Sequence, residues 1–455
     1  MLWIRKLFSI LNRSCLTKIT KMKKLVLSGL MFFAIITFGF NTLFAQKNEW
    51  VNQVIVVNGG KFESGTPTDY VTVQSYNPVT QMTNVFGTIY TQSTQHAVIK
   101  DKYLYVAAQD SIVKYDLDTY QRVVAISDSG ISKLYMYNNR LIVTKQWPIK
   151  RFFVEVLDGT DLSLITRIQN ISGDCGEAVA ANDSIYVAVN GGYAGTQGKL
   201  AVLDPSDWTL KDEINFGGEA KGLINLYNYN GLINGVCRTP AGSTNSGFLL
   251  IYDYFTGLAN MINYEVTLGE GYGRKDNLLY VNMNNGIGTF NLLDHTIQDT
   301  MVIPDPGSMF KVNIASAAID YVGGNIYYNV GNMITFGRGV IANSAGDSVG
   351  SYPTGLNPDA IAIDYRVPVG IESPSENLSV SVYPNPVTEI LRVYMPVKAE
   401  ISAISISDPT GRIFRSGFTP AANGASVDCS DLTPGIYFLN IRTAAGNVTR
   451  KFIKQ

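Results

Sequence analysis

Two short sequence patterns recur along residues 50–366 and constrain the possible folds of this chain more than any other feature. The first is an apolar run that occurs seven times, as VIVVNG at 54, YLYVAA at 103, RLIVTK at 140, SIYVAV at 184, GLINGV at 231, LLYVNM at 278 and NIYYNV at 325. The second ends in Asp or Asn and also occurs seven times, at Asn77, Asp116, Asp158, Asp204, Asp253, Asn291 and Asn343. Short apolar runs separated by Gly, Asn, Asp and Ser predict strands, and no sustained helical period interrupts them.

The Asp or Asn of the second pattern predicts a tight turn. In six copies a Thr or Asp follows three residues later, at Thr80, Thr119, Asp161, Asp207, Thr256 and Asp294. A side-chain oxygen of this type can accept hydrogen bonds from backbone amides just ahead of it and close a hairpin. We therefore expect each copy to join the third and fourth strands of a unit. A carboxylate that binds a metal is the alternative, but a turn alone already requires one such residue per repeat.

Four short strands per unit, repeated seven times, predict an all-β fold in the form of a seven-bladed β-propeller over residues 50–366. The segment LNPDAIAIDY at 356–365 has the character of an inner strand, and the opening QVIVVNG at 53–59 has no inner strand before it. We expect these two ends to share one blade and close the ring, which removes exposed strand edges.

The repeats lack the paired Gly-His and Trp-Asp of WD repeats, the recurring double-glycine pattern of kelch repeats and the sialidase box. The unit resembles the YncE-like propellers through LYVAAQDSIVKYDLDTYQRVVAI (104–126) and IYVAVNGGYAGTQGKLAVLDPSDWTLKDEI (185–214). The stretch at 54–80 is similar to the first blade of a surface-exposed branch of that family. Some members of that branch are cobalamin-capturing lipoproteins that work beside an outer-membrane transporter. The chain departs from them because it has no lipoprotein cysteine.

A second, small domain is predicted at 378–455, after a linker at 367–377 that contains Pro and Ser. ILRVYM at 390–395 alternates apolar and polar residues, and about six such strands would make a small β-sandwich. The domain resembles the C-terminal sorting domain of type IX secretion substrates of the Bacteroidota, through VYPNPV (382–387), ISISDPTGRIF (404–414), LTPGIYFLNIRT (432–443) and VTRKFIK (448–454). The residues that carry the resemblance are Tyr383, Pro384, Asn385, Pro386, Gly435, Tyr437 and Lys451. It implies export across the outer membrane, removal of the domain by a sortase-like peptidase and attachment to surface glycolipid. A carbohydrate-binding or structural sandwich is the alternative.

The N-terminal residues 1–45 have the layout of a secretory signal peptide. Met22, Lys23 and Lys24 are followed by an apolar run to Phe40 and by a small Ala45. A membrane anchor is the alternative, although the run is short for a full span. Residues 1–21 are a basic prefix, so either Met1 or Met22 starts the protein.

Charge and residue usage exclude several classes of function. The chain has 36 Lys and Arg against 37 Asp and Glu, which argues against a nucleic-acid partner. Only His96 and His295 are present, and no HExxH or phosphate-loop motif occurs, so we expect no catalytic constellation, no metal site and no cofactor. Cys175, Cys237 and Cys429 are expected to be buried thiols, with one disulfide as the alternative.

Candidate ligand contacts fall into two groups on one face of the ring. Long loops between the second and third strands, together with blade-connecting loops, could bring Phe62, Trp147, Tyr193, Arg238 and Tyr272 to one mouth. His96, Glu177, Lys221 and Asp359 precede or begin inner strands and could line the channel entrance. Ordinary polar propeller surface is the alternative for both groups.

These features favour a secreted or cell-surface binding protein without catalytic activity. Its expected partners are the type IX secretion machinery with its sortase, an unknown small-molecule, glycan or protein ligand, and an outer-membrane transporter. The alternatives are a lyase- or lactonase-like propeller enzyme and an adhesive envelope component. Three or more carboxylates around the channel would favour the enzyme, whereas an aromatic, partly apolar mouth would favour capture of a small molecule.

Overall fold

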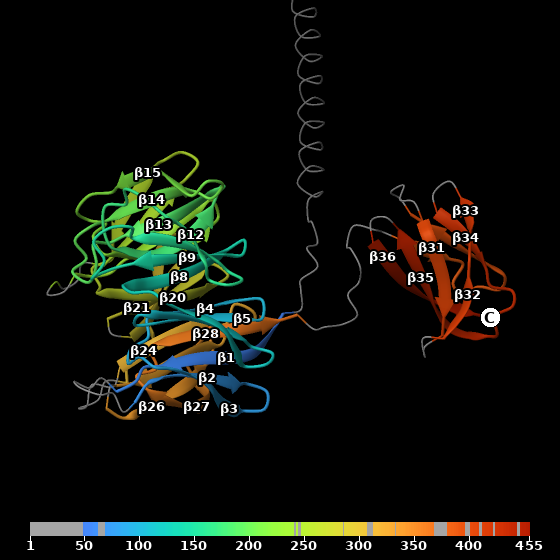
Figure 1. Ribbon diagram of the computed structural model, residues 1–455, viewed down its shortest axis with the longest axis horizontal. Helices are drawn as coiled ribbons and strands as arrows, with labels where there is room; N and C mark the ends of the chain where they lie inside the picture. Colours follow the sequence, from blue (N-terminus) through green and yellow to red (C-terminus); the bar gives the residue numbers. More distant parts are fainter. Residues whose placement is uncertain are drawn as a thin grey trace, which may run out of the picture. The chain divides into compact units, whose positions relative to one another are not determined.

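The computed structural model divides the chain into two compact units, Met1–Val367 and Pro368–Gln455 (Figure 1). It describes residues 49–61, 69–240, 243, 247–284, 286–306, 313–332, 334–367, 380–395, 401–408, 412–421, 424–443 and 446–455. The predicted signal peptide and residues 368–377 of the predicted linker lie outside these ranges. All regular elements in the described ranges are strands.

The first unit contains seven four-stranded antiparallel sheets, which agrees with the seven predicted repeats. Each sheet is given from its inner to its outer strand. The first three are β28 (Ala360–Arg366), β1 (Trp50–Asn58), β2 (Val71–Asn77) and β3 (Met82–Ile89); β4 (His96–Lys100), β5 (Tyr103–Ala108), β6 (Ser111–Asp116) and β7 (Gln121–Ser127); and β8 (Ile131–Tyr137), β9 (Arg140–Lys145), β10 (Val154–Asp158) and β11 (Leu164–Arg167).

The next four sheets repeat this order. They are β12 (Cys175–Ala181), β13 (Ser184–Val189), β14 (Lys199–Asp204) and β15 (Thr209–Asn215); β16 (Leu223–Tyr229), β17 (Leu232–Cys237), β18 (Phe248–Asp253) and β19 (Ala259–Asn263); β20 (Leu268–Lys275), β21 (Leu278–Met283), β22 (Gly286–Asn291) and β23 (Thr296–Ile303); and β24 (Asn313–Ile319), β25 (Ile326–Gly331), β26 (Phe336–Ala342) and β27 (Ser348–Leu356).

The seven sheets form a closed ring, because each inner strand contacts the inner strand of the next sheet and β24 contacts β28. The closing sheet joins the two ends of the unit, as predicted. β28 pairs antiparallel with β1, with Val54 opposite Ile363 and Trp50 opposite Arg366. The buried Asp364 carboxylate reinforces this seam, since it accepts hydrogen bonds from the Gln53 amide at 2.9 Å and from Arg366 Nε at 2.7 Å.

Burial explains why the second and third strands dominate the sequence pattern. Five of the six residues of β5 are buried in succession, because both faces of the strand pack against neighbouring sheets. The outermost strand β7 has no buried residue, since each of its residues is exposed or half-buried. One hydrophobic cluster joins Ile55 of the first sheet to Leu104 of the second, and similar clusters link the later sheets around the ring.

The predicted Asx turns are present between the third and fourth strands. Asn77 Oδ1 accepts hydrogen bonds from the backbone amides of Val79 and Thr80, both at 2.9 Å. Equivalent bonds are made by Asp116, Asp158, Asp204, Asp253, Asn291 and Asn343. The second pattern therefore closes hairpins.

The second unit is a sandwich of two four-stranded sheets. They are β29 (Ser381–Tyr383), β30 (Ile390–Tyr394), β34 (Gly424–Asp428) and β33 (Thr419–Ala421); and β32 (Ile413–Ser416), β31 (Ile401–Ser407), β35 (Gly435–Thr443) and β36 (Gly446–Lys454). The expectation of about six strands was low by two, because β29 and β33 have only three residues each. Leu391 and Val393 of one sheet and Ile406 and Leu439 of the other are buried in a single core.

The YPNP segment connects the start of this unit to its last strand. Asn385 Oδ1 accepts a hydrogen bond from the Ile453 amide at 2.9 Å, and the Val387 amide donates to the Ile453 carbonyl at 2.8 Å. Pro384 and Pro386 flank Asn385 outside the paired strands, where a missing amide donor costs nothing. Tyr437 is buried, and its hydroxyl donates to the Thr433 carbonyl at 3.0 Å.

Candidate functional site

The propeller has two chemically different faces. We call the upper face the one formed by the loops between second and third strands and by the connections from each fourth strand to the next sheet. The lower face carries the turns between first and second and between third and fourth strands. The long loops predicted between second and third strands lie on this upper face, at 59–69, 145–152, 190–198 and 237–247, although residues 62–68, 241–242 and 244–246 lie outside the described ranges.

A cavity of about 590 Å³ opens at the upper end of the channel, and we call it the central cavity. All seven sheets or the segments directly before them contribute to its lining, which is mostly polar. The charged and hydrogen-bonding side chains in the lining are Thr94, Gln95, His96, Lys133, Glu177, Asn225, Tyr227, Arg238, Glu270, Tyr272, Asn282, Ser316 and Asp359.

An ion pair crosses this cavity. Lys133 Nζ of β8 lies 2.7 Å from Glu270 Oε2 of β20, three sheets further around the seven-membered ring. Burial lowers the pKa of Lys133, but attraction to Glu270 outweighs burial and the net pKa is raised. Lys133 lowers the pKa of Glu270 against the opposing effect of burial. Both groups are therefore charged at neutral pH.

A hydrogen-bonded chain runs along the part of the cavity wall that lies between the strands of this ion pair. Asn225 Nδ2 donates to Glu177 Oε2 at 2.8 Å, and Asn225 Oδ1 accepts from the Gly271 amide at 2.8 Å. Burial raises the pKa of Glu177, and the bond from Asn225 opposes that shift. This chain fixes the position of the Glu177 carboxyl across three successive sheets.

Burial disfavours the charged forms of both Asp359 and His96. Burial and the nearby charge of Glu270 raise the pKa of Asp359 from 3.8 to about 7. Burial and the Lys133 charge lower the pKa of His96 to about 3, and its Nδ1 accepts a hydrogen bond from the Leu134 amide at 3.2 Å. Near pH 7 the His96 imidazole is thus neutral, whereas the Asp359 carboxyl exchanges its proton in that range.

The rim carries one cation and one aromatic ring. The Arg238 guanidinium lies 5.5 Å from the centre of the Tyr193 ring and donates to the Tyr193 carbonyl at 2.8 Å. The Tyr193 side chain is 82% exposed. Deeper in the cavity, the Tyr272 hydroxyl accepts a hydrogen bond from Asn282 Nδ2 at 3.1 Å.

The structure brings five of the predicted site residues together in the central cavity: His96, Glu177, Arg238, Tyr272 and Asp359. Tyr193 contacts Arg238 without lining the cavity. Lys221 is exposed on the connection before β16 and does not line it, because Asn225 takes the corresponding place inside the strand. Trp147 is 80% exposed and also lies outside the cavity lining. Phe62 lies outside the described residues.

Sequence reasoning missed Lys133, Asn225 and Glu270. Together with Glu177 they occupy the third position of four consecutive inner strands, β8, β12, β16 and β20. An alignment of the inner strands with one another at this third position would have identified these residues. The sequence prediction instead used the loops that precede the strands.

Within the described ranges, no group of three or more His, Cys, Asp or Glu side chains is arranged to hold a metal ion. Those ranges also contain no helix with the length and apolar character needed to cross a membrane. Cys175 and Cys237 are buried free thiols, as expected, and Cys429 is also buried.

The described residues define a propeller with a charged central cavity, followed by a β-sandwich. Residues 381–455 match the family model of the secretion system C-terminal sorting domain. The chain therefore carries a type IX secretion sorting domain. This domain implies an interaction with the type IX secretion system and export to the cell surface or the medium.

No curated protein matches the sequence. Among solved structures, the computationally designed Ika8 protein is 12% identical with a TM-score of 0.44, and the match covers 74% of this chain and 92% of that one. The WD40 β-propeller domain of Doa1 is 11% identical with a TM-score of 0.43, covering 62% and 93%. The dihydro-heme d1 dehydrogenase NirN is 15% identical with a TM-score of 0.46, covering 69% and 75%.

Proposed function

We propose that this exported protein binds a small polar ligand in the central cavity and does not transform it. The main support is that polar side chains from all seven sheets, or from the segments directly before them, line the central cavity of about 590 Å³. Cavities of a few hundred cubic ångströms suit ligands of small-molecule size.

The internal pairing of the charges supports binding over catalysis. Glu270 is neutralised by Lys133, and Glu177 is held by Asn225. Residues fixed in this way form a preorganised hydrogen-bonding surface, which lowers the entropic cost of binding. Arg238, Tyr272 and Asp359 remain to orient a ligand that carries both donors and acceptors.

The proposal is tested by calorimetric titration with neutral and charged glycans, peptides and porphyrin-like cofactors. Cobalamin is included because the repeats resemble the YncE-like propellers, whose surface-exposed branch works beside outer-membrane transporters. Arg238→Ala and Tyr272→Phe should each weaken a bound ligand by about tenfold, the usual cost of losing one good polar contact. Arg122→Gln, an exposed arginine on β7 outside the cavity, is the control. A ligand that binds all four proteins equally would place the site elsewhere.

A propeller enzyme is the second candidate, favoured by three carboxyl groups around the cavity, those of Glu177, Glu270 and Asp359. A carboxyl with a pKa of about 7 is suited to general acid–base chemistry at neutral pH. Turnover of a lactone or a uronate polymer that is abolished by Asp359→Asn would establish this alternative. Ligand binding without any product would support the first.

A further inference from the structure

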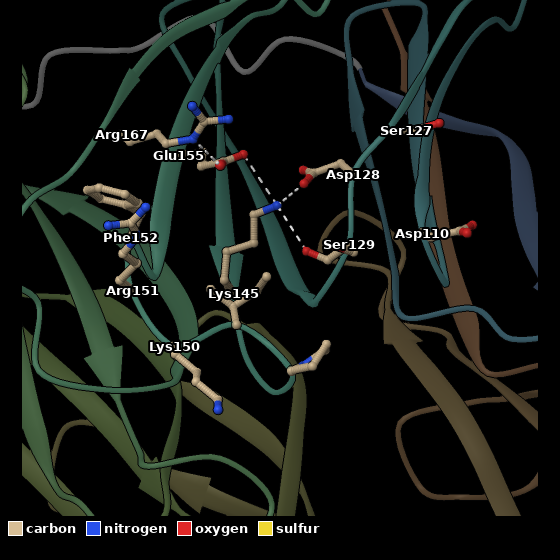
Figure 2. Close-up of a pocket in the computed structure, with 12 residues that line it drawn as sticks. Asp110, Ser127, Asp128, Ser129, Lys145, Lys150, Arg151, Phe152, Glu155 and Arg167 are labelled. Atoms are coloured by element: carbon tan, nitrogen blue, oxygen red, sulfur yellow. Dashed lines mark hydrogen bonds and ion pairs between the residues drawn. The ribbon is translucent and has the colours of Figure 1, made fainter.

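A second cavity, of about 840 Å³, lies on the upper face between the second and third sheets, and it shares no residue with the central cavity. We call it the Lys145 cavity. Its walls come from the end of β7, the connection to β8, the end of β9 and the loop at 146–153 (Figure 2). The lining residues are Asp110, Ser127, Asp128, Ser129, Lys145, Pro148, Ile149, Lys150, Arg151, Phe152, Glu155 and Arg167.

Lys145 organises one wall of this cavity. Its side chain is 2% exposed, and Nζ contacts Asp128 Oδ1, the Ser129 carbonyl at 3.2 Å and Glu155 Oε2 at 3.3 Å (Figure 2). Glu155 Oε1 accepts from Arg167 Nε at 2.8 Å. The three ammonium protons and both Glu155 oxygens are thus occupied, so these groups serve to position their neighbours.

One buried acceptor in the wall has no partner among the described residues. Asp128 Oδ1 binds Lys145, but Asp128 Oδ2 is shielded from solvent and accepts no hydrogen bond there. A buried carboxylate oxygen without a donor is costly, since it loses its hydration without compensation. The side chain lines the cavity beside the hydroxyl-bearing Ser127 and Ser129. This arrangement favours a ligand that donates hydrogen bonds, as a sugar hydroxyl does.

Positive charge lines the other wall. Lys150 and Arg151 lie in the loop at 146–153, and no ion pair to either is recorded within the described ranges. Arg167 uses Nε for Glu155 and remains half-exposed, so its outer nitrogens can still donate. The Arg151 guanidinium lies 5.0 Å from the centre of the Phe152 ring, and both residues line the cavity. The N–H groups of Lys150, Arg151 and Arg167 that are not used in ion pairs can donate hydrogen bonds to an anion.

We propose that the Lys145 cavity binds an acidic glycan, specifically a uronic-acid sugar. Its carboxylate contacts Arg151 and Lys150, and its hydroxyls donate to Asp128 Oδ2 and exchange hydrogen bonds with Ser129. The two walls hold the two chemical features that distinguish such a sugar from a neutral one and from an inorganic anion.

The test is calorimetric titration of the purified protein with digalacturonate, compared with a neutral galactose disaccharide and with inorganic sulfate. Digalacturonate should bind at least about tenfold more tightly than either comparison ligand, and rising salt should weaken it because exposed charges are screened. Equal affinity for the neutral disaccharide, or no binding of digalacturonate, would overturn the inference.

Two variants separate the walls of the cavity. Arg151→Gln should weaken digalacturonate about tenfold without disturbing the buried lysine, whereas Arg122→Gln should leave it unchanged. Asp128→Asn should also weaken the sugar but not sulfate, with the melting temperature measured in parallel because Lys145 loses a partner. Unchanged digalacturonate binding in Arg151→Gln would contradict the proposal. Failure at this cavity leaves the central cavity untouched, because the two share no lining residue.

Discussion

At the scale of single residues, Asp359 is the group of the central cavity whose charge changes near neutral pH. Burial and the Glu270 charge raise its folded-state pKa from 3.8 to about 7. The folded protein therefore binds this proton more tightly than the unfolded chain. The contribution of Asp359 to folding is most favourable below pH 4 and declines as pH rises toward 7.

Asp359→Asn should remove this penalty. The melting temperature of the variant minus that of the parent should be larger at pH 8 than at pH 5. Only the parent must ionise the buried carboxyl as the pH rises. Scanning calorimetry at the two pH values measures the difference. The same offset at both pH values would show that Asp359 ionises as an ordinary surface acid.

The sequence predicted some residues of the central cavity and not others. Glu177 and Asp359 were found because each stands at the start of a recognisable inner strand. Lys133 and Glu270 were missed because the pair joins residues 137 positions apart, and only the closed ring brings them within 2.7 Å. Nothing local to Lys133 predicts that partner.

At the scale of elements, the Asx turn after the third strand can be tested by substitutions at one residue, Asn77. Asn77→Ala should remove two hydrogen bonds to the backbone and destabilise the protein by about 1 kcal/mol. Asn77→Asp keeps the acceptor and should resemble the parent in urea unfolding. Equal losses in both variants would mean that the oxygen is not what stabilises the turn.

The loop at 146–153 depends on a glycine in the connection before β8. Gly130 has φ of +67°, and an added Cβ would lie 2.4 Å from Ile149 Cγ1. Gly130→Ala should therefore cost more than the roughly 1 kcal/mol of the backbone conformation alone, and it should weaken ligand binding in the Lys145 cavity. Gly257→Ala is the matched control, because Gly257 has φ of +73° and open space around it. If urea unfolding showed the same loss of unfolding free energy in both variants, the clash with Ile149 would be ruled out.

Elements were predictable in proportion to their burial. The second and third strands, such as β5 and β14, are apolar on both faces and produced the repeat. The outer strand β11 has four residues, of which three are exposed, and left no such signal. The three-residue strands β29 and β33 of the sandwich were missed for the same reason, since short exposed strands have little apolar pattern.

At the scale of the whole molecule, the ring depends on the seam between β1 and β28. A chain that ends at Val367 should unfold cooperatively, because the propeller is complete without the sandwich. A chain that ends at Asn357 lacks β28, exposes the edge of β1 and leaves the inner strands β4 and β24 without their shared neighbour.

Calorimetry should thus show a melting temperature for the shorter chain that is lower by many degrees, or no cooperative transition at all. The longer chain serves as its control, since it differs only by the ten residues 358–367. Equal stability of the two would mean that the seam does not hold the ring closed.

The same seam sets the point at which the chain leaves the propeller. Trp50 and Arg366 are opposite each other, and both lie at the lower face, whereas the two cavities are lined from the upper face. A protein moored to a cell surface through the segment after Val367 would therefore be tethered from the face that carries neither cavity. A ligand in either cavity and the point where the chain leaves the propeller would therefore lie on opposite faces of the ring.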